Sequence, residues 1–358
     1  STAPLSLYHN SSVIFHTANQ PDTWDASGRH YPGTRYKSYT NYFAFQTSVA
    51  YLAFPVWFFT AKLGRDYLSL GPGYRSSVIL SSDAPTLDQI LIKTEQPNYK
   101  LLWFVAGLSR WYEYSRFLSG QRGEINLTKH LRLGSTMLVV WSPDSLQTKN
   151  ALGYLNPLVP LYLEKSITGD DDNVLVGFDL TLYLKNLKLY GALLVDNYEF
   201  NTRPDRPPNC YGLTAGLYLP FRDWALRTEY SKITRYTYYH RIYHLAYTHY
   251  SVPLGHSLGP DADELYGRLE YYPQEHLRLA WVWLWVRRGD GNLGSVEHKT
   301  WDSQESPIRI FPSPPVRKYL TIGFEGIYFP SSRVEFKTGL YYEYREQKFM
   351  NFVSLSCF

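Results

Sequence analysis

Apolar and polar residues alternate with a period of two along most of this chain. Between residues 334 and 345 the even positions, apart from Thr338, are apolar or aromatic, and every charged residue lies at an odd position. The same alternation returns in residues 174–184, 264–271 and 320–328. Successive side chains of a β-strand point to opposite faces, so each run is predicted to be a strand with one apolar face. No helical window competes with these runs, and the chain is predicted to be mostly antiparallel β-sheet.

One segment has the length of a membrane-spanning helix. Residues 38–61 contain no charged residue, and residues 43–63 are long enough for a single span. Pro55 in the middle, three consecutive polar residues at 46–48 and many aromatic and β-branched side chains argue against a helix. The segment is predicted to form two strands, over residues 42–52 and 56–65, separated by Pro55.

The composition narrows the class of protein further. The 358 residues include 33 Tyr, 18 Phe and 10 Trp but only two Cys, with a net charge of +4. So many aromatic residues exclude a disordered chain, and two cysteines cannot make a disulfide scaffold. A net charge this small does not indicate a nucleic-acid-binding protein. A mean hydropathy of −0.33 does not suit a bundle of transmembrane helices.

The positions of the aromatic residues indicate that the apolar face of the sheet contacts lipid and does not pack on a second sheet. They cluster near predicted strand ends, at residues 103–104, 111–112, 218, 224, 271–272 and 328–329. This distribution is typical of the girdles of a transmembrane barrel, whereas a sandwich core favours Val, Ile and Leu. We therefore predict an all-β fold, a transmembrane antiparallel β-barrel of the bacterial outer membrane, as one domain over residues 1–358. At about 20 residues per strand unit it would have about 18 strands, with 16–18 as the range.

The residue type of the last position fits an outer-membrane barrel, but its place in the alternation of the last strand does not. Many bacterial outer-membrane barrels end in Phe, as this chain does at Phe358. Ser354 and Ser356 share its parity, while Val353 and Leu355 fall on the other face. Either the final strand has two mixed faces or a bulge shifts its phase.

Two regions, residues 62–85 and 253–266, combine a Gly-Pro turn with charged residues at a predicted strand end. Their glycines allow close backbone approach, and Arg65, Asp66, Asp261 and Asp263 are predicted to form lumenal ion pairs that hold an inward fold. The lumen is thus expected to be plugged by inward-folded loops. The full lumenal or turn cluster comprises Gly64, Arg65, Asp66, Gly71, Pro72, Gly73, Asp83, Gly255, His256, Gly259, Pro260, Asp261 and Asp263.

These two motifs carry a resemblance to a known family. Gly-Arg-Asp, Gly-Pro-Gly and Leu-Ser-Ser-Asp-Ala-Pro, followed by Leu-Gly-His and Gly-Pro-Asp-Ala-Asp, resemble the bacterial capsule-assembly outer-membrane family Wzi. The resemblance extends from about residue 40 to the C-terminus. It implies an 18-stranded outer-membrane barrel that acts as a surface lectin for capsular polysaccharide. Family members often carry an additional periplasmic helical segment, for which the sequence shows no matching window.

Metal sites are not favoured by the spacing of the acidic and histidine residues. Asp261, Asp263 and Glu264 lack the spacing of a calcium loop, and a turn role is preferred for them. Residues 170–173 are interpreted as a solvated acidic loop. His240 and His244 have the spacing of a helical zinc pair, but in a strand they would lie about 13 Å apart. No cofactor is predicted, and Cys210 and Cys357 are as readily two thiols as a disulfide.

The function predicted is that of a non-enzymatic barrel that binds an acidic surface polysaccharide. Tyrosine and tryptophan faces stack on sugar rings and arginines meet uronic acids, so the segments 110–122 and 287–318 are expected to be binding loops. Their candidate sugar-binding residues are Arg110, Trp111, Tyr112, Arg116, Arg287, Arg288 and Trp301. A porin or solute channel with a charged lumen is the second hypothesis. An outer-membrane hydrolase is the third, although no nucleophile motif is present.

Overall fold

The chain folds into one large antiparallel sheet. The computed structural model describes residues 6–16, 42–146, 148–197, 209–291, 310–331, 334–344 and 348–357. Within this part of the chain sixteen strands pair in sequence order, interrupted only where β12 and β13 form a small sheet of their own. The all-β, antiparallel prediction is confirmed, and sixteen lies within the predicted range of strands.

The strands alternate in direction along the chain. The large sheet consists of β1 (Ser6–His16), β2 (Tyr42–Val56), β3 (Phe59–Asp66), β4 (Leu87–Glu95), β5 (Tyr99–Trp111), β6 (Tyr114–Asn126), β7 (Leu131–Trp141), β8 (Asn173–Leu184), β9 (Leu187–Asn197), β10 (Cys210–Phe221), β11 (Trp224–Ile233), β14 (Ala262–Gln274), β15 (Leu277–Arg288), β16 (Arg317–Ser331), β17 (Val334–Glu343) and β18 (Lys348–Cys357). The small sheet pairs β12 (Thr248–His249) with β13 (Val252–Pro253).

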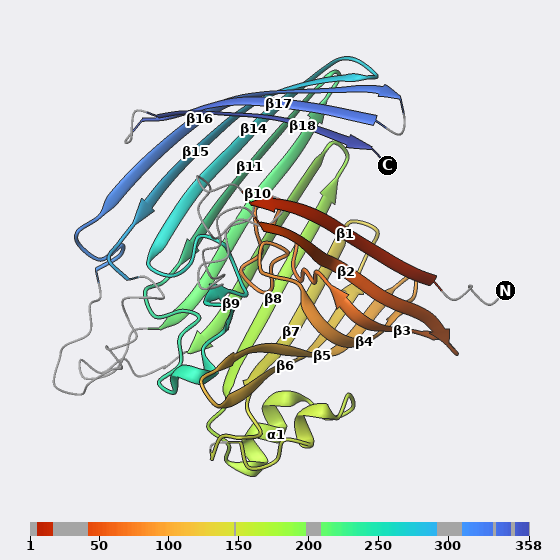
Figure 1. Ribbon diagram of the computed structural model, residues 1–358, viewed down its shortest axis with the longest axis vertical. Coiled ribbons are helices and arrows are strands. Elements are labelled where there is room, and N and C mark those ends of the chain that lie inside the picture. Colours follow the sequence, from red (N-terminus) through yellow and green to blue (C-terminus); the bar gives the residue numbers. More distant parts are fainter. Residues whose placement is uncertain are drawn as a thin grey trace.

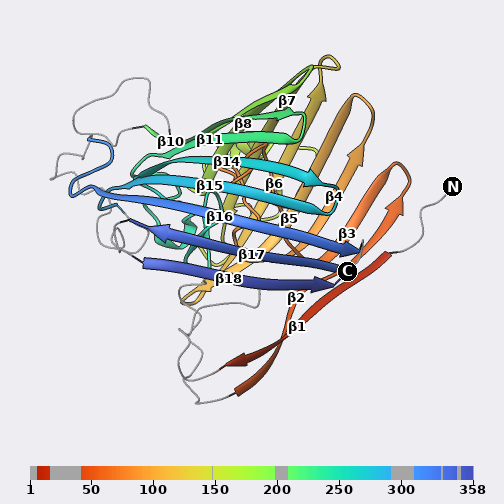
Figure 2. The same cartoon turned by 90° about the horizontal axis from the view of Figure 1, so that it is seen from above.

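The sheet curls on itself, so that its N-terminal strands turn back toward the C-terminal ones (Figure 2). Every neighbouring pair from β1 to β18 is hydrogen-bonded. Among the described residues no pairing joins β1 to β18, and these two strands lie apart at the edges of the curl in Figure 1. The pairing of β17 with β18 shows no register shift, so the mixed phase of the last strand does not come from a bulge against β17.

Two local predictions needed correction. β2 runs through Pro55 to Val56 and turns only at residues 57–58, so Pro55 lies beside the hairpin turn rather than between two strands. The structure also contains a helix that the sequence analysis missed, α1 (Leu161–Thr168), preceded by the 3-10 helix η1 (Gly153–Leu155). No helix in the described ranges is long and apolar enough to cross a membrane.

The outer face of the sheet is apolar and exposed. In β8, for example, Phe178 and Leu180 are exposed, while Asp179 and Thr181, which alternate with them, are buried. The predicted alternation is therefore confirmed, with the apolar side chains on the outside. Phe104, predicted to lie near a girdle, is instead fully buried on the inner face.

Two long connections fold into the interior. We call them the inner segments: residues 67–86, between β3 and β4, and residues 234–261, between β11 and β14. Val78, Ile79 and Leu80 from the first pack in one buried cluster with Tyr238 and Tyr247 from the second. Inward-facing strand residues complete this cluster: Leu91, Phe104, Ala106, Leu108, Leu118, Leu138, Val140, Leu175, Ala192 and Leu194. The predicted inward fold is thus present, and its core is the main apolar core of the molecule.

The two ends of the curled sheet differ in their connections. At one end the strands are joined by short turns, at residues 57–58, 96–98, 127–130, 185–186, 222–223 and 275–276. The other end carries the long connections 67–86, 142–172 and 234–261, with the short β5–β6 turn among them. We call these the short-turn end and the long-segment end. They lie on opposite sides in Figure 2.

Candidate functional site

The two inner segments are held together by buried tyrosines. The Tyr238 hydroxyl donates to the carbonyl oxygen of Val78 at 2.9 Å, and the Tyr247 hydroxyl donates to that of Ile79 at 2.8 Å. All four residues are fully buried. A Cβ on Gly255 would lie 2.3 Å from the Tyr238 hydroxyl, so only glycine fits at this motif position.

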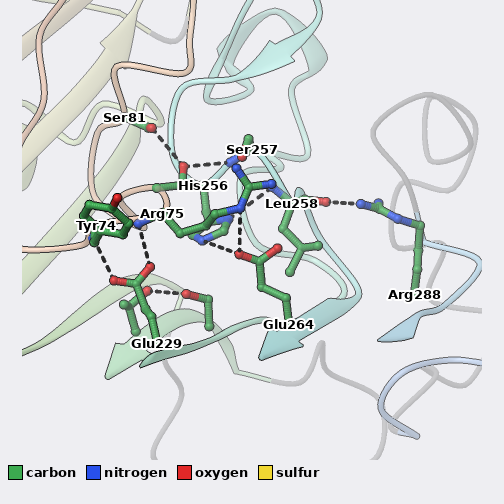
Figure 3. A network of polar contacts seen from close by, with 12 residues as sticks. Tyr74, Arg75, Ser81, Glu229, His256, Ser257, Leu258, Glu264 and Arg288 are labelled. Carbon is green, nitrogen blue, oxygen red and sulfur yellow. Dashed lines mark hydrogen bonds and ion pairs between the residues drawn. The ribbon is translucent and has the colours of Figure 1, made fainter. Parts of the chain in front are cut away.

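Further hydrogen bonds join the two Gly-Pro motifs directly (Figure 3). The Ser257 N–H donates to the Ser76 hydroxyl oxygen at 3.1 Å, a contact across 181 positions of sequence. The Ser81 N–H donates to the carbonyl of Leu254 at 2.8 Å. The two regions that the sequence analysis singled out therefore meet inside the sheet and form one structural unit.

Glu229 on β11 anchors this unit to the wall. Its carboxylate accepts the N–H of Tyr74 at 2.7 Å and the N–H of Arg75 at 2.9 Å. The same carboxylate accepts the Tyr190 hydroxyl at 2.8 Å. The sequence analysis missed this residue. Its position along the strand could have revealed it: Glu229 is a carboxylate on the inward-facing side of β11, the side that also carries the small residues Ala225 and Ser231.

His256 lies fully buried at the centre of the unit. The Leu258 N–H donates to its Nδ1 at 3.1 Å, which places the ring proton on Nε2, 3.6 Å from the Glu264 carboxylate. Burial, together with the nearby Arg75 guanidinium, lowers the pKa of His256 to about 3. The imidazole is therefore neutral and serves as a packed hydrogen-bonding group rather than as a charge.

Two of the predicted ion pairs form in the interior. Asp66 pairs with Lys62 and also accepts the Tyr67 N–H at 2.7 Å. Asp261 is fully buried, and its carboxylate pairs with Arg235 at 3.1 Å and accepts the Ser313 N–H at 2.9 Å. Asp66 thus fixes the start of the first inner segment, and Asp261 fixes the connection around Ser313.

The other two motif charges lie on the outer face. Arg65 forms a bidentate pair with Asp88, at 2.8 Å and 2.6 Å, on the face that carries the exposed Ile90. Asp263 pairs with Arg287 on the face that carries the exposed Leu265. Their predicted lumenal position is wrong. Each residue lies an even number of positions from an exposed apolar residue of its strand, so its side chain is on the outer face and not on the inner one.

The remaining motif residues are turn elements of the inner segments. Gly71 has φ +105° and Gly259 has φ +70°, backbone conformations that favour glycine. Pro72, Gly73 and Pro260 belong to the same turns, and Gly64 in β3 has φ +133°. The Asp83 N–H donates to the Ser81 hydroxyl at 3.1 Å.

The acidic residues between α1 and β8 are structural rather than a solvated loop. Asp170 accepts the Lys149 N–H at 3.0 Å and is buried. Asp172, also buried, accepts the Thr148 hydroxyl at 2.5 Å, and burial raises its pKa to about 6. The described residues contain no group of three or more His, Cys, Asp or Glu that could hold a metal ion.

Arg116 is a buried clamp, not an exposed sugar contact. The segment 110–122 forms the ends of β5 and β6 and a two-residue turn rather than a long loop. The Arg116 guanidinium donates to the carbonyls of His244, Ala246 and Thr248 and so fixes the second inner segment against the strands. Its predicted surface role is wrong because the residue points inward.

The exposed part of the β5–β6 hairpin lies at the long-segment end. Tyr112 has a left-handed φ of +51° and is 85% exposed. Trp111 contacts it edge-on with ring centroids 6.0 Å apart, and the exposed Arg110 donates to the Glu113 carbonyl at 2.9 Å. These three predicted residues are brought together on the surface.

Tyr250 joins this surface and was missed by the sequence analysis. It is 45% exposed, and its N–H donates to the Ser109 hydroxyl at 2.7 Å. The Ser109 N–H donates to His249 Nδ1 at 2.8 Å, so the tip of the second inner segment is fastened beside the hairpin. We call Arg110, Trp111, Tyr112 and Tyr250 the rim cluster.

The other predicted loop contributes less. Arg287 is committed to Asp263, and Arg288 donates to the Leu258 carbonyl of the second inner segment. Trp301 lies outside the described residues, as do all of residues 292–309. The candidate surface is therefore the rim cluster.

Comparison with known proteins identifies the family. The model of the capsule assembly protein Wzi family matches residues 8–339. The chain belongs to the Wzi family. No curated protein sequence matches this Wzi-family chain.

Two solved structures that resemble this chain are outer-membrane proteins, and the first has a TM-score high enough to show the same fold. One is Wzi of Escherichia coli, an outer-membrane protein involved in group 1 capsule assembly and described as a carbohydrate-binding β-barrel. It is 16% identical, with a TM-score of 0.61 over 87% of this chain and 68% of that one. OccD3 of Pseudomonas aeruginosa is 13% identical, with a TM-score of 0.49 over 88% of this chain and 78% of that one.

The fold and the family place the chain in the bacterial outer membrane. Short turns face the periplasm and longer loops face outward in such barrels. The short-turn end is accordingly periplasmic, and the rim cluster is extracellular. Trp224 stacks on Tyr271 at 4.4 Å on the exposed face of the short-turn end, as expected of an interfacial girdle.

Proposed function

We propose that this Wzi-family chain binds capsular polysaccharide at its extracellular end and takes part in holding the capsule on the cell. The observation that carries the proposal is the rim cluster, where a strongly exposed tyrosine, a second exposed tyrosine and an arginine gather outside a filled interior. Aromatic faces stack on sugar rings, and guanidinium groups pair with carboxylates. Family membership and the carbohydrate binding of the Escherichia coli relative support the same function.

The ligand class that fits best is an acidic polysaccharide. Among the described residues Arg110 donates one hydrogen bond, to the backbone carbonyl of Glu113, and is exposed. Its remaining N–H groups are suited to a uronic acid carboxylate or a sugar hydroxyl. Tyr112 and Tyr250 provide flat surfaces for the rings on either side of such a group.

A cellular experiment tests the role. Deleting the gene in its encapsulated host should release capsular polysaccharide into the medium while leaving its synthesis unchanged, and a plasmid copy should restore retention. Unchanged cell-associated capsule, with no glycan binding by the purified protein, would overturn the proposal.

A solute channel is the second candidate, and the buried interior argues against it. The space enclosed by β4 to β11 is filled by side chains that have no exposed surface, those of Val78, Ile79, Tyr238 and Tyr247. A channel would need a continuous polar path through this region. Large, steady single-channel currents from the wild-type protein in planar bilayers would favour the channel.

A hydrolase is disfavoured despite one suggestive pair. The Ser145 hydroxyl lies 3.0 Å from His244 Nε2, within hydrogen-bond reach of a base. Both residues are buried, and His244 stacks on Tyr114 with ring centroids 4.0 Å apart. We propose a structural role for this pair. Neither the wild-type protein nor the Ser145→Ala variant should hydrolyse the polysaccharide.

A further inference from the structure

The segment 142–172, which includes η1 and α1, folds back over the outside of the sheet. Val139 and Trp141 of β7 are buried against Tyr154 and Leu161 of this segment. They alternate with Leu138 and Val140, which belong to the interior core. The segment therefore covers the outer face, on the side of β7 away from the inner segments, and Figure 1 shows α1 outside the curl.

Several polar groups of this segment are hydrogen-bonded within it or to the sheet. Lys165 donates to the Asp172 carbonyl at 2.8 Å, and Asn150 donates to the Glu164 carboxylate at 2.6 Å. Gln121 of β6 donates to the carbonyl of Val159 at 2.8 Å. Both charged side chains of α1 are thus paired within the segment. Two further exposed charges of the segment are also bonded: Lys149 donates to the Gly169 carbonyl at 2.8 Å, and Asp144 accepts the Ser115 N–H at 2.7 Å.

The outward surface is apolar instead. Leu158 is 88% exposed and Ile167 is 78% exposed, and Leu152, Tyr162 and Leu163 are exposed beside them. A helix on a water-facing surface presents its polar side outward, so this arrangement is inverted. Such an exposed apolar patch marks a contact with a partner or with lipid.

The position on the barrel identifies lipid as that partner. The same outer face of β6, β7 and β8 exposes Ile125, Leu133, Phe178 and Leu180 below the segment, which form the lipid-facing band. Val139 lies about 20 Å above the first residue of β7, at ~3.3 Å per residue and a tilt of ~40°. The apolar band of such barrels is about 25 Å tall, so the segment continues it at the level of the outer leaflet.

We propose that residues 142–172 form an interfacial anchor that lies in the outer leaflet, with the side chains of Leu158, Leu163 and Ile167 against lipid acyl chains. Amphipathic helices of membrane surfaces bury their apolar side in this manner, at the boundary of headgroups and chains. The anchor would hold β6–β8, and with them the rim cluster, at a fixed height above the membrane. The proposal rests on the outer-membrane location and not on polysaccharide binding.

Site-directed fluorescence tests the proposal on the full chain. Leu158→Cys and Ile167→Cys, each with Cys357→Ser, are labelled with a bimane fluorophore and placed in phosphatidylcholine vesicles; Cys210 is buried. Tyr112→Cys, at the extracellular hairpin tip, is the matched control. Leu163→Cys replaces any variant that fails to fold, as judged by heat-modifiable gel migration.

Nitroxide-labelled acyl chains should quench positions 158 and 167 at least about threefold more than position 112. Aqueous iodide should show the opposite order. Iodide quenching at 158 and 167 equal to that at 112 would overturn the proposal. Shielding of both positions from iodide and from the nitroxide lipids would also overturn it, because it would mean that protein covers the patch.

Discussion

The hydroxyl of Tyr238 donates to the backbone carbonyl of Val78 at 2.9 Å, deep inside the sheet. The same oxygen accepts the N–H of His256 at 3.0 Å. One side chain thus links the first inner segment to the Gly-His motif of the second.

Replacing Tyr238 with Phe removes both hydrogen bonds while keeping the ring. A buried carbonyl and a buried N–H then lose their partner, at a cost of about 1–3 kcal/mol each. The free energy of unfolding, measured by urea titration in detergent micelles, should fall accordingly. Tyr112→Phe is the matched control, because the Tyr112 side chain is exposed, and it should change the stability by less than about 0.5 kcal/mol.

Glu229→Gln should loosen the first inner segment. The carboxylate accepts three hydrogens, from two backbone N–H groups and the Tyr190 hydroxyl. An amide turns its NH₂ group toward one of these donors, leaving it unpaired. We expect transient channel openings in planar bilayers that the wild type lacks. A silent Glu229→Gln variant would show that this anchor is not required to keep the interior closed.

Acid should destabilise the fold through its buried histidines. Burial, with Arg75 or Arg116 nearby, lowers the pKa of His256 to about 3 and that of His249 to about 4. The unfolded chain takes up these protons near pH 6.5, before the folded chain does. Stability from both groups is therefore complete above about pH 6.5 and is lost as the pH falls toward 4 and 3.

The urea midpoint at pH 7.5 and at pH 4.5 measures this effect. His256→Gln should flatten the pH dependence of the urea midpoint, whereas Trp57→Ala, which replaces an exposed side chain that does not titrate, should leave that dependence unchanged. An identical slope in wild type and His256→Gln would contradict the assignment of a buried neutral imidazole.

Arg116→Lys should destabilise the protein because a single ammonium cannot reach all the carbonyls that the guanidinium spans. These include the carbonyls of His244, Ala246 and Thr248. The loss should be about 2 kcal/mol or more, since charge-assisted hydrogen bonds contribute about 1.5–3 kcal/mol each. Arg110→Lys, on the exposed hairpin, should stay within about 0.5 kcal/mol of wild type. Equal effects of the two substitutions would contradict the buried clamp.

The strands were predictable from sequence because alternation records the two environments directly. In β8 the side chains of Phe178 and Leu180 face outward and that of Asp179 between them faces inward. Only a strand with two different faces explains this pattern. The inward fold was predictable from the Gly-Pro motifs, whose glycines mark close backbone approach. Arg65 and Asp263 were assigned to the wrong face because their charge suggests an inward position, whereas their strand parity matches that of the exposed Leu63 and Leu265.

The rest of the site depends on contacts between distant residues. Arg116 binds backbone carbonyls about 130 positions away, and Glu229 binds N–H groups about 155 positions away. Backbone partners leave no mark in the sequence. Helix α1 was missed for a different reason: its outward face is apolar, so it lacks the polar stripe by which a water-exposed helix is recognised.

Direct binding of polysaccharide to the rim cluster tests the central claim. The wild-type protein in lipid nanodiscs should bind purified host capsular polysaccharide, measured by biolayer interferometry. Tyr112→Ala with Tyr250→Ala should weaken binding about 5- to 150-fold, since each aromatic contact contributes about 0.5–1.5 kcal/mol beyond its buried area. Trp57→Ala, at the exposed periplasmic turn, is the control and should bind like wild type. Unchanged affinity in the double variant would contradict the account.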